Sequence, residues 1–258
     1  MTGPHIAGTW DSAVAEIDRL ARALYGPQPR EVRGVLHVVS AVAANDGRLH
    51  VIQIGPRAPQ SDTDFFVLNY WRAHADAILT SAQVVRSEPK LSHELQSAHA
   101  AELELFRVHA LKKTEPPLCA ILTRSGSLPL EHRVWQDRTR NLVLTTPERA
   151  DALRGSLGNR AEVAGVDALD PARAVAWLRE QGAETILIET GPSTVATLYE
   201  PMQVDHLMLS RCEGRVDRQA IGLALPEHDK MFAGMTRVAS TLRDERSGSW
   251  RFERYDRA

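Results

Sequence analysis

The stretch at residues 189–194, Glu-Thr-Gly-Pro-Ser-Thr, combines residue types that could hold an anion. Gly191 allows a ligand to approach the backbone closely, and Pro192 suits the first turn of a helix. The hydroxyls of Ser193 and Thr194 lie among the N–H groups that a helix start leaves unpaired. Because such a start attracts phosphate, the pattern predicts a cradle for the diphosphate of a dinucleotide. An ordinary strand-to-helix turn remains the alternative, since one glycine is weaker evidence than a glycine-rich fingerprint.

The elements around this stretch predict a parallel sheet. Residues 185–188 form a short β-branched run typical of a strand, and the apolar residues after Pro192 keep helical spacing. Strands separated by helices of about ten residues imply parallel crossovers, with helices on both faces of the sheet. Ligands of such sheets gather beyond the carboxyl ends of the strands. We expect strands at 33–42, 75–79, 118–123, 141–145, 161–166 and 204–210, helices at 11–25, 147–157 and 171–181, and a closing antiparallel hairpin at 236–244 and 249–255.

Two further segments, at residues 80–84 and 124–125, follow predicted strand ends, so we expect them on the same rim. The loop at residues 80–84 is built of small and polar residues, and Arg124-Ser125 follow a strand and suit a phosphate. Asn45-Asp46-Gly47 is strong turn chemistry, for which a simple hairpin is the alternative. On the helix expected after Ser61, Arg72 could bind a phosphate with two hydrogen bonds or could pair on the surface with Asp76.

Several short blocks, in order, resemble one known family. They are Asp46-Gly47-Arg48, WRAHADAIL at 71–79, VRSEPKL at 85–91, TRSGSLP at 123–129 and ILIETGPSTVATLYEPMQVDHLMLS at 186–210. Together they are similar to the riboflavin-biosynthesis reductase domain, the C-terminal reductase of the bifunctional deaminase–reductase. The resemblance spans residues 32–255 and implies a dihydrofolate-reductase-like α/β fold, with a mostly parallel central sheet and a C-terminal antiparallel hairpin.

The resemblance also implies an activity. The chain is expected to reduce 5-amino-6-(5-phosphoribosylamino)uracil with NADPH, as a homodimer. No zinc-deaminase signature is present, so we expect a stand-alone reductase. The implied catalytic residues are Glu189 and Asp46, with Arg72, Leu91 and Glu189 on the substrate. The implied cofactor-binding residues are Ser81, Val84, Glu88, Arg124, Ser125, Gly191, Pro192, Ser193 and Thr194.

Departures from the family pattern keep two alternatives open. Val84 replaces a threonine, Thr190 replaces a small residue, and residues 211–215 replace a glycine-rich segment. These changes favour either a reductase of the same fold acting on another pterin-like, folate-like or natural-product substrate, or a non-catalytic relative that binds a nucleotide weakly.

Composition sets wider limits. The net charge of −2 disfavours nucleic acid and anionic membranes as partners, and Cys119 and Cys212 suggest buried thiols in a reducing cytoplasm. No apolar stretch approaches the roughly 20 residues of a membrane span. We expect a helical extension at residues 1–30 before a reductase-like domain at 31–258. Residues 92–113, with three histidines on different faces, predict a solvated surface helix and no metal site.

Overall fold

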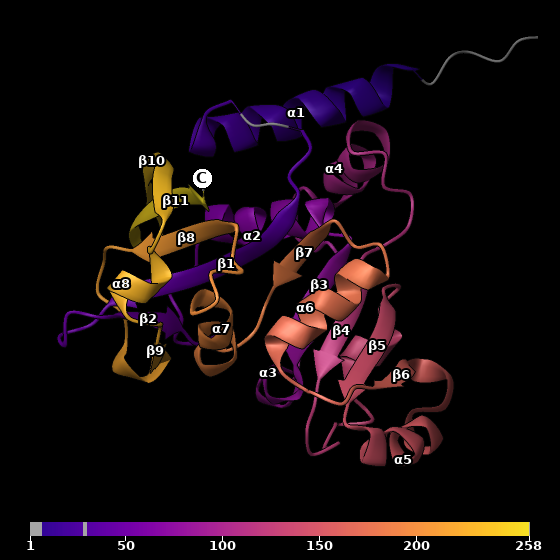
Figure 1. Ribbon diagram of the computed structural model, residues 1–258. Helices are drawn as coiled ribbons and strands as arrows, with labels where there is room; N and C mark the ends of the chain where they lie inside the picture. Colours follow the sequence, from indigo (N-terminus) through magenta and orange to yellow (C-terminus); the bar gives the residue numbers. More distant parts are fainter. Residues whose placement is uncertain (1–6, 28–29, 258) are drawn as a thin grey trace, which may run out of the picture.

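The computed structural model describes residues 7–27 and 30–257, and within them eleven strands form one sheet flanked by helices (Figure 1). The helices are α1 (Ala7–Tyr25), α2 (Asp62–His74), α3 (Ala82–Ser87), α4 (Ala100–Leu105), α5 (Pro147–Leu157), α6 (Pro171–Glu180), α7 (Pro192–Tyr199) and α8 (His228–Met231). The strands are β1 (Gly34–Ala43), β2 (Leu49–Ile52), β3 (Ala77–Ser81), β4 (Leu118–Leu122), β5 (Arg140–Thr145), β6 (Glu162–Gly165), β7 (Thr185–Ile188), β8 (His206–Cys212), β9 (Ile221–Ala224), β10 (Met235–Glu245) and β11 (Gly248–Arg257).

The sheet is parallel at its centre and antiparallel at one end. Its order is β10-β11-β8-β1-β7-β3-β4-β5-β6, and every pair from β8 to β6 is parallel. The β10–β11 hairpin adds to β8 in antiparallel fashion. The predicted fold class is therefore confirmed, and helices connect the parallel strands because only a crossover can bring the chain back to the same end.

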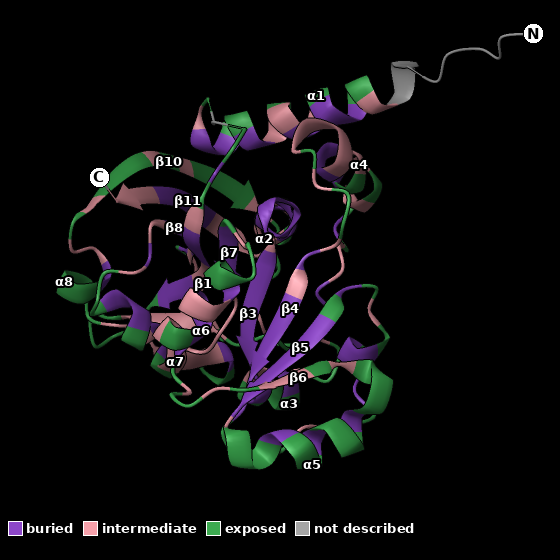
Figure 2. Cartoon of the chain, turned by 45° about the vertical axis from the view of Figure 1, so that its right-hand side comes forward, coloured by how far each residue is buried: buried purple, intermediate pink, exposed green. Residues whose placement is uncertain are grey.

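Both faces of the central strands are buried, because successive side chains of a strand point to opposite faces. On β3, Ile78 packs with α1, α2 and α4, whereas Leu79 packs with α6 and α7. Near the β6 edge, α3 and α5 cover the face that carries Cys119. Figure 2 shows the result: the parallel strands are largely buried, while α5 exposes most of its surface.

The amino-terminal helix packs on the rest of the chain. Val14 and Ile17 of α1 are buried against the core, and the Thr241 hydroxyl of β10 donates to the Leu24 carbonyl at 2.7 Å. Helix α1 begins before the predicted residue 11, and the parts of the expected extension at residues 1–6 and 28–29 lie outside the described residues. Among the described residues, no helix has the length and apolar character needed to cross a membrane.

The predicted surface helix at residues 92–113 is wrong. Residues 88–99 form an irregular segment that lies against the domain, and only α4 and the π-helical turn η1 (Phe106–Ala110) are helical. Ser92 and His93 are buried because Asp137, far along the chain, accepts hydrogen bonds from the Ser92 hydroxyl and the His93 amide. The described residues contain no cluster of three potential metal ligands.

Two short strands were not predicted. β2 pairs with β1 across the turn at residues 44–48, so the Asn45-Asp46-Gly47 sequence does close a hairpin. β9 pairs with β2, and together they form an arm beside the main sheet. Gly222 of β9 lies so close to β2 that an added Cβ would be 2.7 Å from the Val51 side chain, which explains why glycine is needed there.

Candidate active site

Three loops that we predicted on one rim do lie there. β7, β3 and β4 are adjacent and parallel, so the segments that follow them emerge at the same edge of the sheet. These segments contain Glu189 to Thr194, Ser81 to Val84, and Arg124 with Ser125. The Thr80 hydroxyl ties two of the loops together by donating to the Glu189 carbonyl at 2.8 Å.

The start of α7 has the geometry expected of an anion cradle. Gly191 is the N-cap residue, with φ −67° and ψ 162°, and no side chain caps the helix there. Pro192 occupies the first turn. A Cβ added at Gly191 would meet no atom within 4 Å, so packing within the chain does not require the glycine. The open backbone therefore fits the close approach of a phosphate group.

The other loops of the rim are partly engaged by the protein. The Ser81 hydroxyl caps α3 by accepting from the Val84 amide at 3.3 Å. The exposed Arg124 donates from Nη2 to the Leu169 carbonyl at 3.1 Å, and the exposed Ser125 hydroxyl accepts from the Ser127 amide at 3.2 Å. Arg124 keeps further guanidinium donors for a phosphate, because within the described part of the chain only one of its five donors is used.

Behind the rim, Glu189 and Arg72 form a buried ion pair. Arg72 Nε and Nη2 each donate to one carboxylate oxygen of Glu189 at 2.7 Å, and the two side chains are 4% and 11% exposed. Arg72 Nη1 donates to the Ser92 carbonyl at 3.0 Å. The alternative surface pair of Arg72 with Asp76 is wrong, since Asp76 pairs with Lys113. Arg72 is therefore placed to orient Glu189.

His93 and Cys119 complete this buried cluster, and the sequence analysis did not anticipate either residue there. His93 Nδ1 lies 3.2 Å from Cys119 Sγ, and His93 Nε2 lies 3.9 Å from a Glu189 carboxylate oxygen. His93 Nε2 is buried and has no hydrogen-bond partner among the described residues. No local sequence signal marks His93, because its burial depends on Asp137.

Burial and charge set the protonation of the cluster. Burial raises the pKa of Glu189, but the charge and hydrogen bonds of Arg72 outweigh it, so the pKa is lowered and the carboxylate is ionised. Burial lowers the pKa of His93 to about 4, which leaves the ring neutral. Burial, together with the charge of Glu189, raises the pKa of Glu88 to about 7. Burial also raises the pKa of the Cys119 thiol, which stays protonated.

Two predicted site residues, Asp46 and Leu91, do not belong to this cluster. Asp46 is exposed in the β1–β2 turn, where it accepts from the Arg48 amide and contacts His50 Nε2 at 2.9 Å. The last pair between β1 and β7 is His37 with Ile188. From His37, β1 continues to Ala43, which is roughly 20 Å further along the strand at about 3.3 Å per residue. The structure thus does not bring Asp46 to Glu189. Leu91 lies in the segment after Glu88, half-buried against the core.

The fold defines an α/β protein with a mostly parallel central sheet, helices on both faces and a C-terminal antiparallel hairpin. The family model of the RibD C-terminal domain matches residues 38–210, and the chain therefore belongs to this family of reductases. A comparison with curated protein sequences finds no match.

Solved structures share this fold. A pyrimidine reductase-like protein from Corynebacterium diphtheriae is 20% identical, with a TM-score of 0.67, over 92% of this chain and 98% of that chain. The riboflavin biosynthesis reductase Rib7 of Saccharomyces cerevisiae is 14% identical, with a TM-score of 0.55, over 92% and 97%. RibD of Acinetobacter baumannii is 16% identical, with a TM-score of 0.57, over 88% of this chain but 58% of its own length.

Proposed function

We propose that this protein is an NADPH-dependent reductase and that its substrate is 5-amino-6-(5-phosphoribosylamino)uracil. Membership of the RibD C-terminal domain family supports the reaction class. The observation that carries the proposal is the buried Glu189–Arg72 pair directly behind an open helix start at Gly191. This arrangement puts a fixed negative charge beside a place that suits a diphosphate.

The cofactor would be held by the rim. The helix start at Gly191 to Thr194 suits the diphosphate, and the free donors of Arg124 suit the additional phosphate of NADPH. NADPH supplies the hydride, which is chemistry that no side chain can perform. The role of the protein is then to position the electrophilic carbon of the substrate and to exclude water.

Glu189, held ionised by Arg72, would accept hydrogen bonds from the substrate and fix its orientation. Reduction also needs a proton at the atom that receives electrons from the electrophilic carbon. Glu88 keeps a proton near neutral pH, because its pKa is raised to about 7, and it lies close enough to Glu189 and Arg72 to feel their charges. We therefore assign the proton donor to Glu88. A general acid works best when its pKa is near the working pH.

A second candidate is a reductase of the same fold with another pterin-like or folate-like substrate. One observation favours it: the guanidinium of Arg72 donates to Glu189 and to the carbonyls of the segment at residues 92–94, so it is not open to a substrate phosphate. A substrate without a phosphate at this position would suit the site equally well.

Fluorescence titration with NADPH and NADH tests the cofactor first. We expect saturable binding in the micromolar range for NADPH and much weaker binding for NADH, and no binding at millimolar NADPH would remove the proposal. NADPH consumption with the riboflavin intermediate, compared with dihydrofolate, then separates the two substrate classes. If the protein binds NADPH but consumes none with either substrate, the non-catalytic alternative replaces both.

We also infer that the protein forms a homodimer, as the family resemblance implies. The edge strand β10 supports this inference, because Val238 and Leu242 are each 51% exposed on a strand with one unpaired side. Light scattering should give twice the chain mass of 28.6 kDa. A mass of one chain at micromolar concentration would overturn it.

A further inference from the structure

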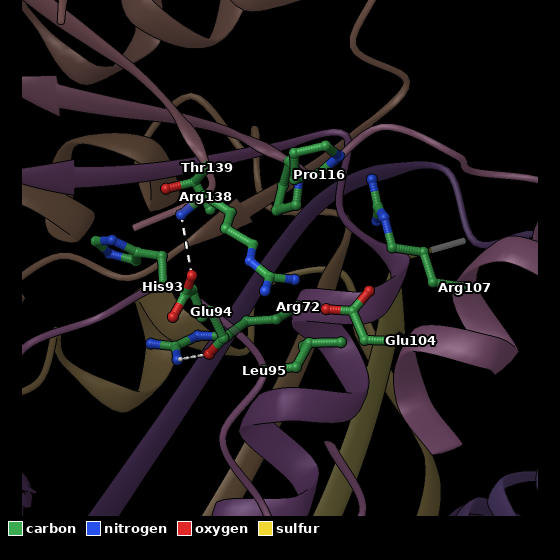
Figure 3. Close-up of a pocket in the computed structure, with 10 residues that line it drawn as sticks. Arg72, His93, Glu94, Leu95, Glu104, Arg107, Pro116, Arg138 and Thr139 are labelled. Atoms are coloured by element: carbon green, nitrogen blue, oxygen red, sulfur yellow. Dashed lines mark hydrogen bonds between the residues drawn. The ribbon is translucent and has the colours of Figure 1, made fainter. Parts of the chain in front are cut away.

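A cavity of about 200 Å³ lies at the amino ends of β4 and β5, at the sheet edge opposite the rim (Figure 3). Pro116 and Pro117 immediately precede β4, and Arg138 and Thr139 immediately precede β5. Helix α4 and the segment after His93 close its other sides. The proposed cofactor loops follow the carboxyl ends of the same strands, so this cavity is separate from them.

Two opposite charges face this cavity without an ion-pair or hydrogen-bond partner, although the charge of Glu104 acts on the nearby Arg107. Within residues 7–27 and 30–257, the exposed guanidinium of Arg138 and the exposed carboxylate of Glu104 form no ion pair or hydrogen bond with each other or with other groups. In Figure 3 their side chains extend toward one another from opposite walls of the cavity. Unpaired charges of both signs across a space of this size suit a ligand that itself carries both signs.

The remaining walls agree with a ligand of zero net charge. Among the described residues, Arg107 donates to the carbonyls of Ala73, Ala75 and Glu115 and to no carboxylate, although the charges of Asp76 and Glu104 act on it. Glu94 uses one carboxylate oxygen to accept from the Arg138 amide at 3.0 Å. Two arginines therefore balance two glutamates around the cavity, apart from the internally paired Arg72. Leu95 and the two prolines add an apolar wall.

We propose that this cavity binds a small zwitterion, an α-amino acid with an aliphatic side chain. Its carboxylate lies on Arg138, its ammonium group on Glu104, and its side chain against Leu95 and the prolines. The volume is of the right size, because a cavity of about 150 Å³ binds benzene, and by the same ratio one of about 200 Å³ holds about eight non-hydrogen atoms, close to the size of leucine.

The site also adjoins the buried pair behind the rim. Arg72 and His93 line the cavity, and His93 Nε2 and Thr139 Oγ1 are buried atoms without hydrogen-bond partners among the described residues. Unpaired buried polar atoms are uncommon in native proteins, and two of them among the residues that line one cavity are consistent with a group that binds there. Binding here can be measured without NADPH, so its outcome does not depend on the proposed reductase activity.

Isothermal titration of the full chain with L-leucine tests the proposal. L-leucinamide lacks the carboxylate, and 4-methylpentanoate lacks the ammonium group. We expect saturable leucine binding that is about fivefold or more tighter than that of either analogue, since each lost charge contact leaves an unpaired group. Absence of saturable leucine binding, or equal affinity for all three compounds, would overturn the proposal.

Two variants assign the contacts. Arg138→Met should abolish the preference of leucine over leucinamide, and Glu104→Gln should abolish its preference over 4-methylpentanoate. Both side chains are exposed, so both variants should fold, and thermal unfolding verifies this. The matched controls are Arg140→Met, which removes a surface pair with Glu162, and Glu102→Gln, from the same helix as Glu104. Leucine affinities that change in the controls as much as in the two variants would refute the assignment.

Discussion

Replacing Glu189 by glutamine tests the central feature of the site, a carboxylate held by a buried guanidinium. Glutamine keeps one acceptor oxygen, but it removes the charge that compensates Arg72, whose side chain is 4% exposed. Removing one partner of a buried ion pair costs about 3–5 kcal/mol, and because glutamine retains one acceptor we expect Glu189→Gln to cost about 3 kcal/mol. For a chain of this size, each kcal/mol lowers the melting temperature by about 2–4 °C, so we expect a decrease of roughly 6–12 °C.

Denaturant unfolding at neutral pH measures this cost, and Arg72→Met completes a double-mutant cycle. The double variant should lose less unfolding free energy than the sum of the losses in the two single variants. Each single change leaves one buried charge unpaired, whereas the double change removes both charges. Arg140→Met is the matched control: its partner Glu162 is 66% exposed, and loss of such a surface pair costs about 0–1 kcal/mol.

The reductase activity of Glu189→Gln should also fall, since the neutral amide no longer offers an anionic acceptor to the substrate. Two results would refute the reasoning. One is a stability loss no larger than that of Arg140→Met together with additive effects in the cycle. The other is an unchanged turnover in a variant that still binds NADPH, which would remove Glu189 from the reaction.

Two further predictions concern buried groups with shifted pKa values, and a third concerns the open space at Gly191. Burial lowers the pKa of His37 and His74 to about 3 and that of His93 to about 4, so the unfolded chain binds protons that the folded protein resists. The free energy of unfolding should therefore decrease as pH falls below about 6.5, by up to about 1.4 kcal/mol per pH unit for each histidine. Denaturation curves that coincide between neutral and mildly acidic pH would contradict this prediction. If Glu88 supplies the proton, kcat/KM should decline as pH rises above about 7, and this decline should be absent in Glu88→Gln. Identical pH profiles of the two proteins would exclude Glu88 as the proton donor. Gly191→Ala should leave the melting temperature unchanged, because the added Cβ meets no atom within 4 Å. The same variant should bind NADPH about tenfold more weakly, because the methyl group keeps the diphosphate away from the backbone. An unaltered affinity in the fluorescence titration would place the diphosphate elsewhere.

The sequence predicted the central sheet well because its signals there are local. The runs at β3, β4, β5 and β7 are short, apolar and bounded by turn residues, and buried parallel strands are continuously apolar. Prolines at the first turns of α5, α6 and α7 marked the starts of these helices. Their alternation was enough to predict which loops share one edge of the sheet.

The segment at residues 92–113 shows where local signals fail. Its composition is typical of a surface helix, but Asp137 holds the Ser92-His93 backbone in an irregular path, and Phe106 is buried in the core. The partner of Arg72 was missed for the same reason. Asp76 is four residues away and offers a local pair, whereas Glu189 is 117 residues away and becomes its partner through the adjacency of α2 and β7.

The amino-acid sequence by itself determined the alternation of strands and helices, and with it the rim that carries Gly191 and Arg124, because periodicity and turn chemistry act over a few residues. Only the tertiary structure decided what lies behind the rim: the pairing of Arg72 with Glu189, the burial of His93 and the raised pKa of Glu88. Those properties depend on desolvation and on charges brought together from distant parts of the chain, and both exist only after the segments have packed.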